Sequence, residues 1–140
     1  MLVMVAEDSE NDVRSLCTYL DTYAKDHNLS FEVQVFSNGK ELLEAHPEKA
    51  AFILLDIEMP LINGVEAARE LRNRGCTMPL AFLTNLDSFA LEGYTVGALG
   101  YLIKPISFFS FTQMLDRIMT FTERHTPHLV CIKEGNSSTL

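Results

Sequence analysis

The 140-residue chain has room for one substantial hydrophobic core and little room for a second full domain. Hydrophobic residues make up 47% of it and charged residues 21%, a composition that excludes an intrinsically disordered protein. The formal net charge of −8 disfavours nonspecific binding to nucleic acid or anionic lipid. No apolar run has the length of a membrane span and the N-terminus lacks a secretion-signal pattern, so we expect a cytoplasmic protein without membrane contact.

Strand-like and helical patterns alternate through the first half of the chain. A strand is expected at residues 2–6, followed by a helix with Ser9 as its N-cap. Residues 31–36 predict a strand at a sheet edge, because apolar and polar side chains alternate there. A short helix around Leu42 precedes residues 51–55, whose unbroken apolar run indicates a strand at the centre of the sheet.

The second half of the chain continues the same alternation. A helix follows Gly64, and strands are expected at residues 80–83 and 99–103. Between these strands the weak helical signal of residues 87–97 predicts a short or mobile helix. The strongly periodic residues 107–124 predict a long final helix with one broad apolar face. Together the units predict a parallel sheet covered by helices.

Polar residues stand at the ends of four predicted strands. The carboxyl ends of parallel strands converge on one crevice in an open sheet, so we expect these side chains to lie together. Acids, a hydroxyl and a lysine in one place suit a divalent cation beside an anion, and so point to phosphoryl chemistry. In chain order the residues are Glu7 and Asp8, Asp56, Thr84, and Lys104 with Pro105.

Each of these residue types has a distinct chemical use. Asp56 follows the most buried strand, and a carboxylate there can attack a phosphoryl group to form an acyl phosphate. Mg²⁺ would offset the negative charge, with one of Glu7 and Asp8 binding it directly and the other through water. Lys104 can pair with one phosphoryl oxygen, and Thr84 can donate a hydrogen bond to another.

Ordinary structural explanations exist for each residue taken alone. An acid pair after a strand is often a helix N-terminal charge, and a threonine at a strand end is unremarkable. A Lys-Pro pair is a common loop element, although Pro105, after a cis or a trans bond, would fix the loop that aims Lys104. The order of all the residues on four strands of one alternating pattern favours a shared site.

Two other classes of protein could use parts of this pattern. A magnesium-dependent phosphohydrolase of the haloacid dehalogenase type also has a nucleophilic aspartate after a strand. It needs a second aspartate two residues on, where this chain has Glu58, and the chain has no room for a cap domain. A flavin-binding module would need a phosphate-cradling loop after the first strand, where this chain has two acids.

Over residues 1–124 the chain resembles the receiver domain of two-component response regulators. The matching segments are Val5-Ala-Glu-Asp8, Leu54-Leu-Asp-Ile-Glu-Met-Pro60 with Gly64 following, Leu83-Thr84, and Gly100-Tyr-Leu-Ile-Lys-Pro105. The resemblance implies a flavodoxin-like (βα)5 α/β fold, with a doubly wound parallel sheet in strand order 2-1-3-4-5 and a short C-terminal extension.

The resemblance also implies a signalling switch rather than an enzyme with turnover. Asp56 would accept a phosphoryl group from a phosphohistidine on a sensor histidine kinase. Mg²⁺ would be held by Asp8, Asp56 and the backbone carbonyl of Glu58, with Glu7 in support. Many members have aspartate where this chain has Glu7, and we expect metal binding to survive the longer side chain.

A conformational response is the second implication of the resemblance. Thr84 and Tyr101 match the family's switch pair, in which the hydroxyl moves to the phosphoryl group and the aromatic ring turns inward. The other interpretation of Tyr101 is a plain core aromatic residue. Asn85 stands where a small residue is common, which would alter access to the site.

The C-terminal residues 125–140 are expected to be a linker and the start of a truncated output domain. Their segment His128-Leu-Val-Cys-Ile-Lys-Glu-Gly135 is similar to the opening of a LytTR-type DNA-binding domain, and residues 97–106 resemble receivers of that subfamily. DNA would then be contacted only through the absent output domain; the alternative is a simple C-terminal extension.

Dimerisation through the last two helices and the strand between them is common in the family. Phe109, outside the apolar arc of the last helix, would contact a partner or be partly buried at the helix start.

Overall fold

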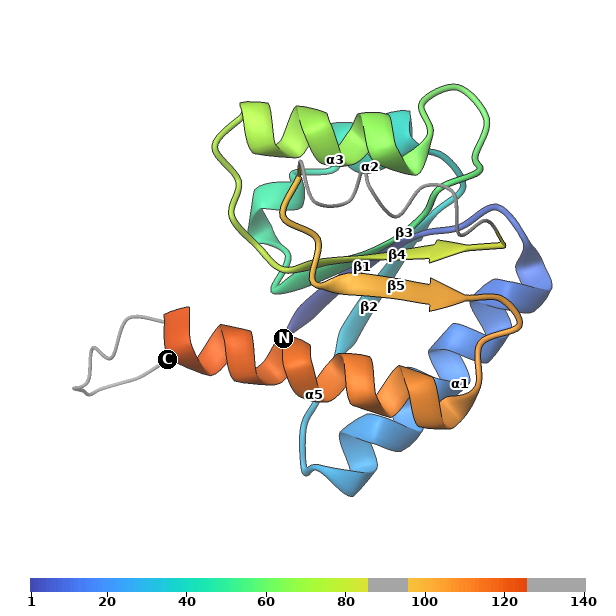
Figure 1. Cartoon of the computed structure of the whole chain (residues 1–140), viewed down its shortest axis with the longest axis vertical. Coiled ribbons are helices and arrows are strands. Elements are labelled where there is room, and N and C mark those ends of the chain that lie inside the picture. The colour runs from blue at the N-terminus through green and yellow to red at the C-terminus, as the bar shows by residue number, and fades with distance from the viewer. Residues whose placement is uncertain (86–95, 126–140) are drawn as a thin grey trace.

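The computed structural model describes residues 1–85 and 96–125 of the chain. Within them, five parallel strands form one sheet in the order β2-β1-β3-β4-β5, flanked by helices on both faces (Figure 1). This confirms the predicted flavodoxin-like topology and strand order. The elements are β1 (Leu2–Ala6), α1 (Glu10–Asp26), β2 (Glu32–Phe36), α2 (Gly39–Glu44), the 3₁₀ turn η1 (Pro47–Lys49), β3 (Phe52–Asp56), α3 (Gly64–Asn73), β4 (Leu80–Thr84), β5 (Gly100–Ile103) and α5 (Phe108–His125).

Burial follows the position of each strand in the sheet. Every residue of β3 and β4 is buried, as the unbroken apolar run of the central strand predicts. At the edge, β2 exposes Glu32 and Val35 and leaves its other residues half-buried. The apolar–polar alternation of β2 therefore identifies an edge strand, although Val35 is left 42% exposed.

The two faces of the sheet carry separate hydrophobic layers. Alternate residues of β1 divide between them: Val3 and Val5 pack on the α1 and α5 side, and Met4 and Ala6 on the α2 and α3 side (Figure 1). Side chains alternate between faces along a strand, so each strand contributes to both layers. The sheet is therefore buried on both faces along its central strands.

Local sequence signals set the helix boundaries. Ser9 caps α1 as predicted, since its hydroxyl accepts a hydrogen bond from the backbone N–H of Asp12. Asn63 and Glu66 form a reciprocal capping box at the start of α3.

On α5, the apolar arc buries four side chains completely, and Phe109, outside the arc, is 70% exposed. The four buried side chains are Phe111, Met114, Leu115 and Ile118.

Two tyrosines tie α1 to α5 and to the loop that precedes it. The hydroxyl of Tyr19 donates to the backbone carbonyl of Ile106 at 2.9 Å, and that of Tyr23 donates to Asp116 at 2.7 Å. These contacts stabilise the helices that cover one face of the sheet. On that sheet, β1 leads to Glu7 and Asp8, and β5 leads to Lys104.

Two of the expectations concern residues outside the described ranges. Most of the short helix expected at residues 87–97 and nearly all of the C-terminal extension belong to them. Among the helices of residues 1–85 and 96–125, none combines the length and apolar character that crossing a membrane requires.

Candidate functional site

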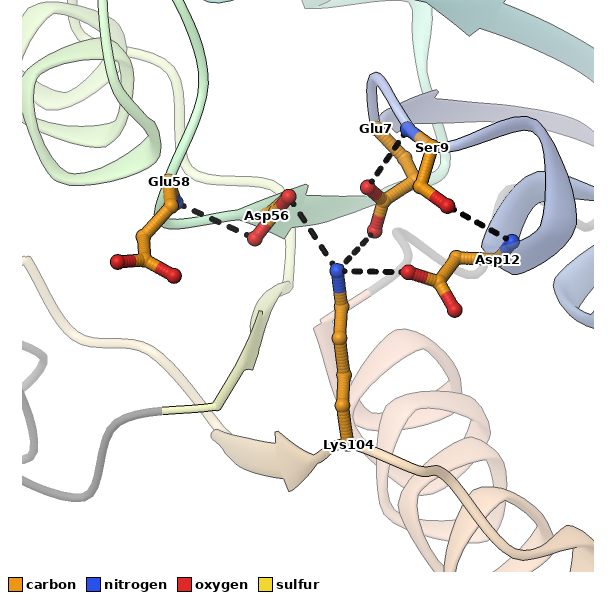
Figure 2. Close-up of polar contacts among 6 residues, drawn as sticks. All are labelled: Glu7, Ser9, Asp12, Asp56, Glu58 and Lys104. Carbon is orange, nitrogen blue, oxygen red and sulfur yellow. Dashed lines mark hydrogen bonds and ion pairs between the residues drawn. The ribbon is translucent and has the colours of Figure 1, made fainter.

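The predicted polar residues meet at the carboxyl edge of the sheet. Asp56 and Thr84 are the last residues of β3 and β4, and Lys104 directly follows β5. The backbone N–H of Lys104 donates to the carbonyl of Thr84 at 2.8 Å. This hydrogen bond continues the β4–β5 pairing and fixes the start of the loop that follows β5. Figure 2 shows Glu7, Asp56 and Lys104, at the carboxyl ends of three different strands, pointing toward one another.

Asp56 is held from two sides. Its carboxylate is almost fully buried, with 4% of the residue exposed. Oδ1 accepts a hydrogen bond from the backbone N–H of Glu58 at 3.2 Å, and Oδ2 lies 3.3 Å from Nζ of Lys104. A buried carboxylate fixed in this way presents a defined oxygen to an incoming group.

Glu7 is the most deeply buried acid of the site. Its Oε2 accepts a hydrogen bond from the backbone N–H of Ser9 at 3.1 Å, and its Oε1 lies 2.7 Å from Nζ of Lys104. Burial raises the pKa of Glu7 to about 7, against the lowering effect of Lys104, and the neighbouring Asp56 adds to the rise. The site therefore carries a carboxylate that is costly to ionise without a further cation.

Lys104 makes three ion pairs with described residues, whereas the sequence predicts only a phosphoryl partner for it. Besides Glu7 and Asp56, its Nζ lies 3.0 Å from Oδ2 of Asp12 (Figure 2). Burial by itself would lower the pKa of Lys104, but these carboxylates outweigh it and raise the pKa well above the ordinary value. Sequence reasoning missed Asp12 in this role; the signal was its position in the first turn of α1, close to the end of β1.

The acids suit a hard divalent cation. Oxygen atoms of Glu7, Asp8 and Asp56 lie within 4.8 Å of one another. Oε1 of Glu7 is buried, and its polar contact with the described residues is the ion pair to Lys104, so it keeps a second lone pair to offer. Mg²⁺ prefers oxygen ligands and keeps several waters, and an all-carboxylate group open on the exposed Asp8 side fits both preferences.

Two backbone features shape the loops around Asp56 and Lys104. The α carbon of Gly64 lies so close to the backbone of Asp56 that a Cβ there would overlap its carbonyl oxygen. The N–H of Gly64 also donates to the carbonyl of Ile57 at 3.1 Å, which closes the loop after β3. The Lys104–Pro105 peptide bond is cis, one of the two isomers considered from the sequence.

The residues of the predicted switch lie beside this cluster. Thr84 is fully buried, and Tyr101 is half-buried with its ring 5.6 Å from that of Phe82, between ring centroids. Their role as a switch pair stays a prediction, as do the metal-binding role of the Glu58 carbonyl and the partner-binding role of Phe109.

Comparisons with known proteins agree with this geometry. The family pattern of the response regulator receiver domain matches residues 3–116. The sensory transduction protein LytT of Oceanobacillus iheyensis is 34% identical over 83% of this chain and 47% of its own length. The transcriptional regulatory protein CiaR of Streptococcus pneumoniae is 31% identical over 87% of this chain and 51% of its own length. Among solved structures, the response regulatory domain of protein mrkE from Klebsiella pneumoniae superposes with a TM-score of 0.79, at 25% identity over 89% of this chain and 99% of that one.

The fold and the acidic cluster at its carboxyl edge define a receiver-type α/β domain. The chain belongs to the response regulator receiver domain family of two-component systems. It spans about half the length of these two curated relatives, of which one is named a sensory transduction protein and the other a transcriptional regulatory protein. Family membership does not favour the phosphohydrolase alternative.

Proposed function

We propose that the domain is a phosphorylation-activated switch in which Asp56 is the phosphoacceptor. The observation that carries the proposal is the buried Asp56 carboxylate, fixed by the Glu58 N–H and faced by the ammonium group of Lys104. A sensor histidine kinase is the phosphodonor that the family implies. This partner supports a cytoplasmic location for the domain.

The transfer step is a displacement at phosphorus. A carboxylate oxygen of Asp56 forms the new O–P bond as the N–P bond of the donor's phosphohistidine breaks, and the imidazole leaves with the electron pair and takes up a proton. Lys104 already lies 3.3 Å from Oδ2 of Asp56, within reach of an oxygen of the transferred group. Its positive charge stabilises the charge that accumulates there.

The acidic cluster supplies the ligands for Mg²⁺. Asp8 and Asp56 would hold the ion together with the Glu58 carbonyl, and Glu7 would support it. When bound, Mg²⁺ neutralises phosphoryl oxygens beside the Asp56 carboxylate. The residues themselves do the positioning: the Ser9 N–H orients Glu7, and the Gly64 contact holds the loop after β3 against Asp56.

The readout of the phosphoryl group would begin at Thr84. Its hydroxyl would turn to a phosphoryl oxygen and Tyr101 would turn inward from its half-buried position, so a local charge change would reach the β4–β5 side of the domain.

Residues 1–124 would act as the receiver and residues 125–140 as a linker and the start of a LytTR-like DNA-binding domain. The similarity to the sensory transduction protein LytT is in line with a LytTR-like output, and the similarity to the transcriptional regulatory protein CiaR supports a role in transcription regulation. A homodimer through the last two helices and the intervening strand, with Phe109 at its face, would be one way to control it.

The test uses the chain with Mg²⁺ and acetyl phosphate, followed by intact mass spectrometry. The expected result is stoichiometric gain of one phosphoryl group, lost in Asp56→Asn and when the metal is chelated. Asp21→Asn is a matched control, because Asp21 is an exposed acid on α1 that pairs with Lys25 instead. Continuous turnover of phosphate esters would instead identify a phosphohydrolase, and a mass gain that persists in Asp56→Asn would refute Asp56 as the acceptor.

A further inference from the structure

The carboxylate of Asp12 approaches Lys104 from a different side than Asp56 does. Its Oδ2 lies 3.0 Å from Nζ, closer than the 3.3 Å of Asp56 Oδ2. In Figure 2 the ammonium group stands between these two acids, with Asp56 reaching it from β3 and Asp12 from the first turn of α1. Asp12 is thus a third anchor on a group that faces the phosphoacceptor.

Asp12 differs from the other two partners of Lys104 in its relation to the metal. Glu7 and Asp56 belong to the group of acids whose oxygens lie close enough to hold one ion, together with Asp8. Asp12 is outside that group. A cation bound there would draw on the lone pairs that Glu7 and Asp56 now offer to Lys104, and phosphorylation would consume one oxygen of Asp56. The Asp12 carboxylate would stay with the ammonium group throughout.

The N-terminus of α1 gives Asp12 a fixed position. Its backbone N–H donates to the hydroxyl of Ser9, whose own N–H donates to Glu7, so one turn of chain orients both acids toward Lys104. A carboxylate in the first turn of a helix is also stabilised by the helix dipole. The Lys104 side chain is only 11% exposed, against 39% for Asp12, so the pair lies at the rim of the site rather than in open solvent.

We propose that Asp12 is a positioning residue that holds the Lys104 ammonium group beside Asp56 while the metal and the phosphoryl group occupy its other partners. The inference rests on the proposed function for the phosphoryl-transfer step, but the hold on Lys104 can be measured without that step. Asp12 itself touches neither the phosphoryl group nor the metal in this scheme.

The charge of Asp12 and its positioning role predict opposite effects on the reaction rate. If Asp12 were simply a negative charge near the site, Asp12→Asn would leave the rate unchanged or speed the approach of an anionic donor. If it positions Lys104, the same change slows phosphorylation, by about three- to tenfold for a modest misplacement of one catalytic group. Asp12→Glu keeps a carboxylate in reach of Lys104 and should restore most of the rate.

The first measurement is the rate of phosphorylation by acetyl phosphate with saturating Mg²⁺. Glu10→Gln is the matched control, because Glu10 is exposed in the same helical turn, and the ion pairs of Lys104 with described residues go to Glu7, Asp12 and Asp56. Slowing in Asp12→Asn with rescue in Asp12→Glu and no slowing in Glu10→Gln supports the proposal. An unchanged or faster Asp12→Asn overturns it.

The second measurement is the rate at which an amine-specific acetylating reagent modifies Lys104, followed by peptide mass spectrometry. Asp12→Asn should increase labelling of Lys104 several-fold, and more with Mg²⁺ than without it, because only then are Glu7 and Asp56 engaged elsewhere. Equal labelling in wild type and Asp12→Asn would overturn the proposal. If the wild type accepts no phosphoryl group, the proposed function fails, yet this labelling result still decides whether Asp12 holds Lys104.

Discussion

Replacing Glu7 by glutamine tests whether a buried, ionised carboxylate weakens the fold when Lys104 is its cationic partner and no metal ion is bound. Glu7 is 2% exposed, and burial raises its pKa from an ordinary value of 4.5 to about 7. Glutamine has nearly the same shape and can still accept the hydrogen bond from the Ser9 N–H. It removes the charge, together with the ion pair to Lys104, which keeps Asp12 and Asp56 as partners.

The sign and size of the effect follow from proton linkage. Between pH 4.5 and 7 the folded state binds more protons at Glu7 than the unfolded state does, so the free energy of unfolding falls as pH rises through this window. Above pH 7 the penalty is fully present. One pKa unit corresponds to about 1.4 kcal/mol, so the full penalty is roughly 3 kcal/mol, and we expect Glu7→Gln to be about 1–3 kcal/mol more stable than wild type at pH 8 without metal.

The assay is urea unfolding followed by far-UV circular dichroism, at pH 5 and pH 8, in the presence of a chelator. The advantage of Glu7→Gln should be small at pH 5 and large at pH 8. Glu10→Gln, at the exposed first residue of α1, should follow the wild type at both pH values. A Glu7→Gln variant that is less stable than wild type at pH 8, or a gap that does not change with pH, would refute the reasoning.

Mg²⁺ should raise the free energy of unfolding more for the wild type than for Glu7→Gln. A ligand at ten times its dissociation constant adds about 1.4 kcal/mol to the free energy of unfolding. Wild type should gain this on addition of Mg²⁺, and Glu7→Gln should gain less because it has lost one carboxylate of the group. Equal gains would mean that Glu7 does not support the metal.

Three further substitutions test contacts that brace the site. Gly64→Ala should lower the free energy of unfolding by about 1–3 kcal/mol, because its Cβ would overlap the carbonyl oxygen of Asp56; unchanged urea unfolding would contradict this. Tyr23→Phe should cost about 0.5–1.5 kcal/mol by losing the hydrogen bond to the largely exposed Asp116. Burial and that hydrogen bond raise the Tyr23 pKa, so wild type should lose stability above about pH 10 and its advantage over the variant should shrink there, which unfolding at pH 8 and 11 would measure. Arg72→Met should cost about 2–4 kcal/mol, since this guanidinium donates to the backbone carbonyls of Cys76, Met78 and Val96, and a thermal midpoint equal to wild type would exclude that role.

The backbone of the site could be predicted because it depends on strand ends. A parallel sheet brings the carboxyl ends of β1, β3, β4 and β5 to one edge. The four polar residues at these ends could therefore be placed together from the hydrophobic pattern alone: Glu7, Asp56, Thr84 and Lys104. The edge position of β2 could be predicted from its alternation of apolar and polar side chains, which indicates a strand with one more exposed face.

The side-chain network could not be predicted in the same way. Whether Asp12 meets Lys104 depends on the angle at which α1 leaves β1, and that angle is set by packing of Leu16 and Leu20 against the sheet. The reach of Arg72 to Val96 likewise depends on where the chain returns before β5. The capping box of Asn63 and Glu66 is different, because its spacing is visible in the sequence and identifies the start of α3.

The charge balance of the site connects its stability with its proposed function. Glu7, Asp8, Asp12 and Asp56 bring up to four negative charges around the single ammonium group of Lys104. Such an excess costs folding free energy in a buried setting, as the raised pKa of Glu7 records. The same excess is what gives a divalent cation its affinity, and a phosphoryl group on Asp56 would add further negative charge beside it. Binding of the cation and retention of the phosphoryl group should therefore strengthen each other, and by linkage the factor must be the same in both directions.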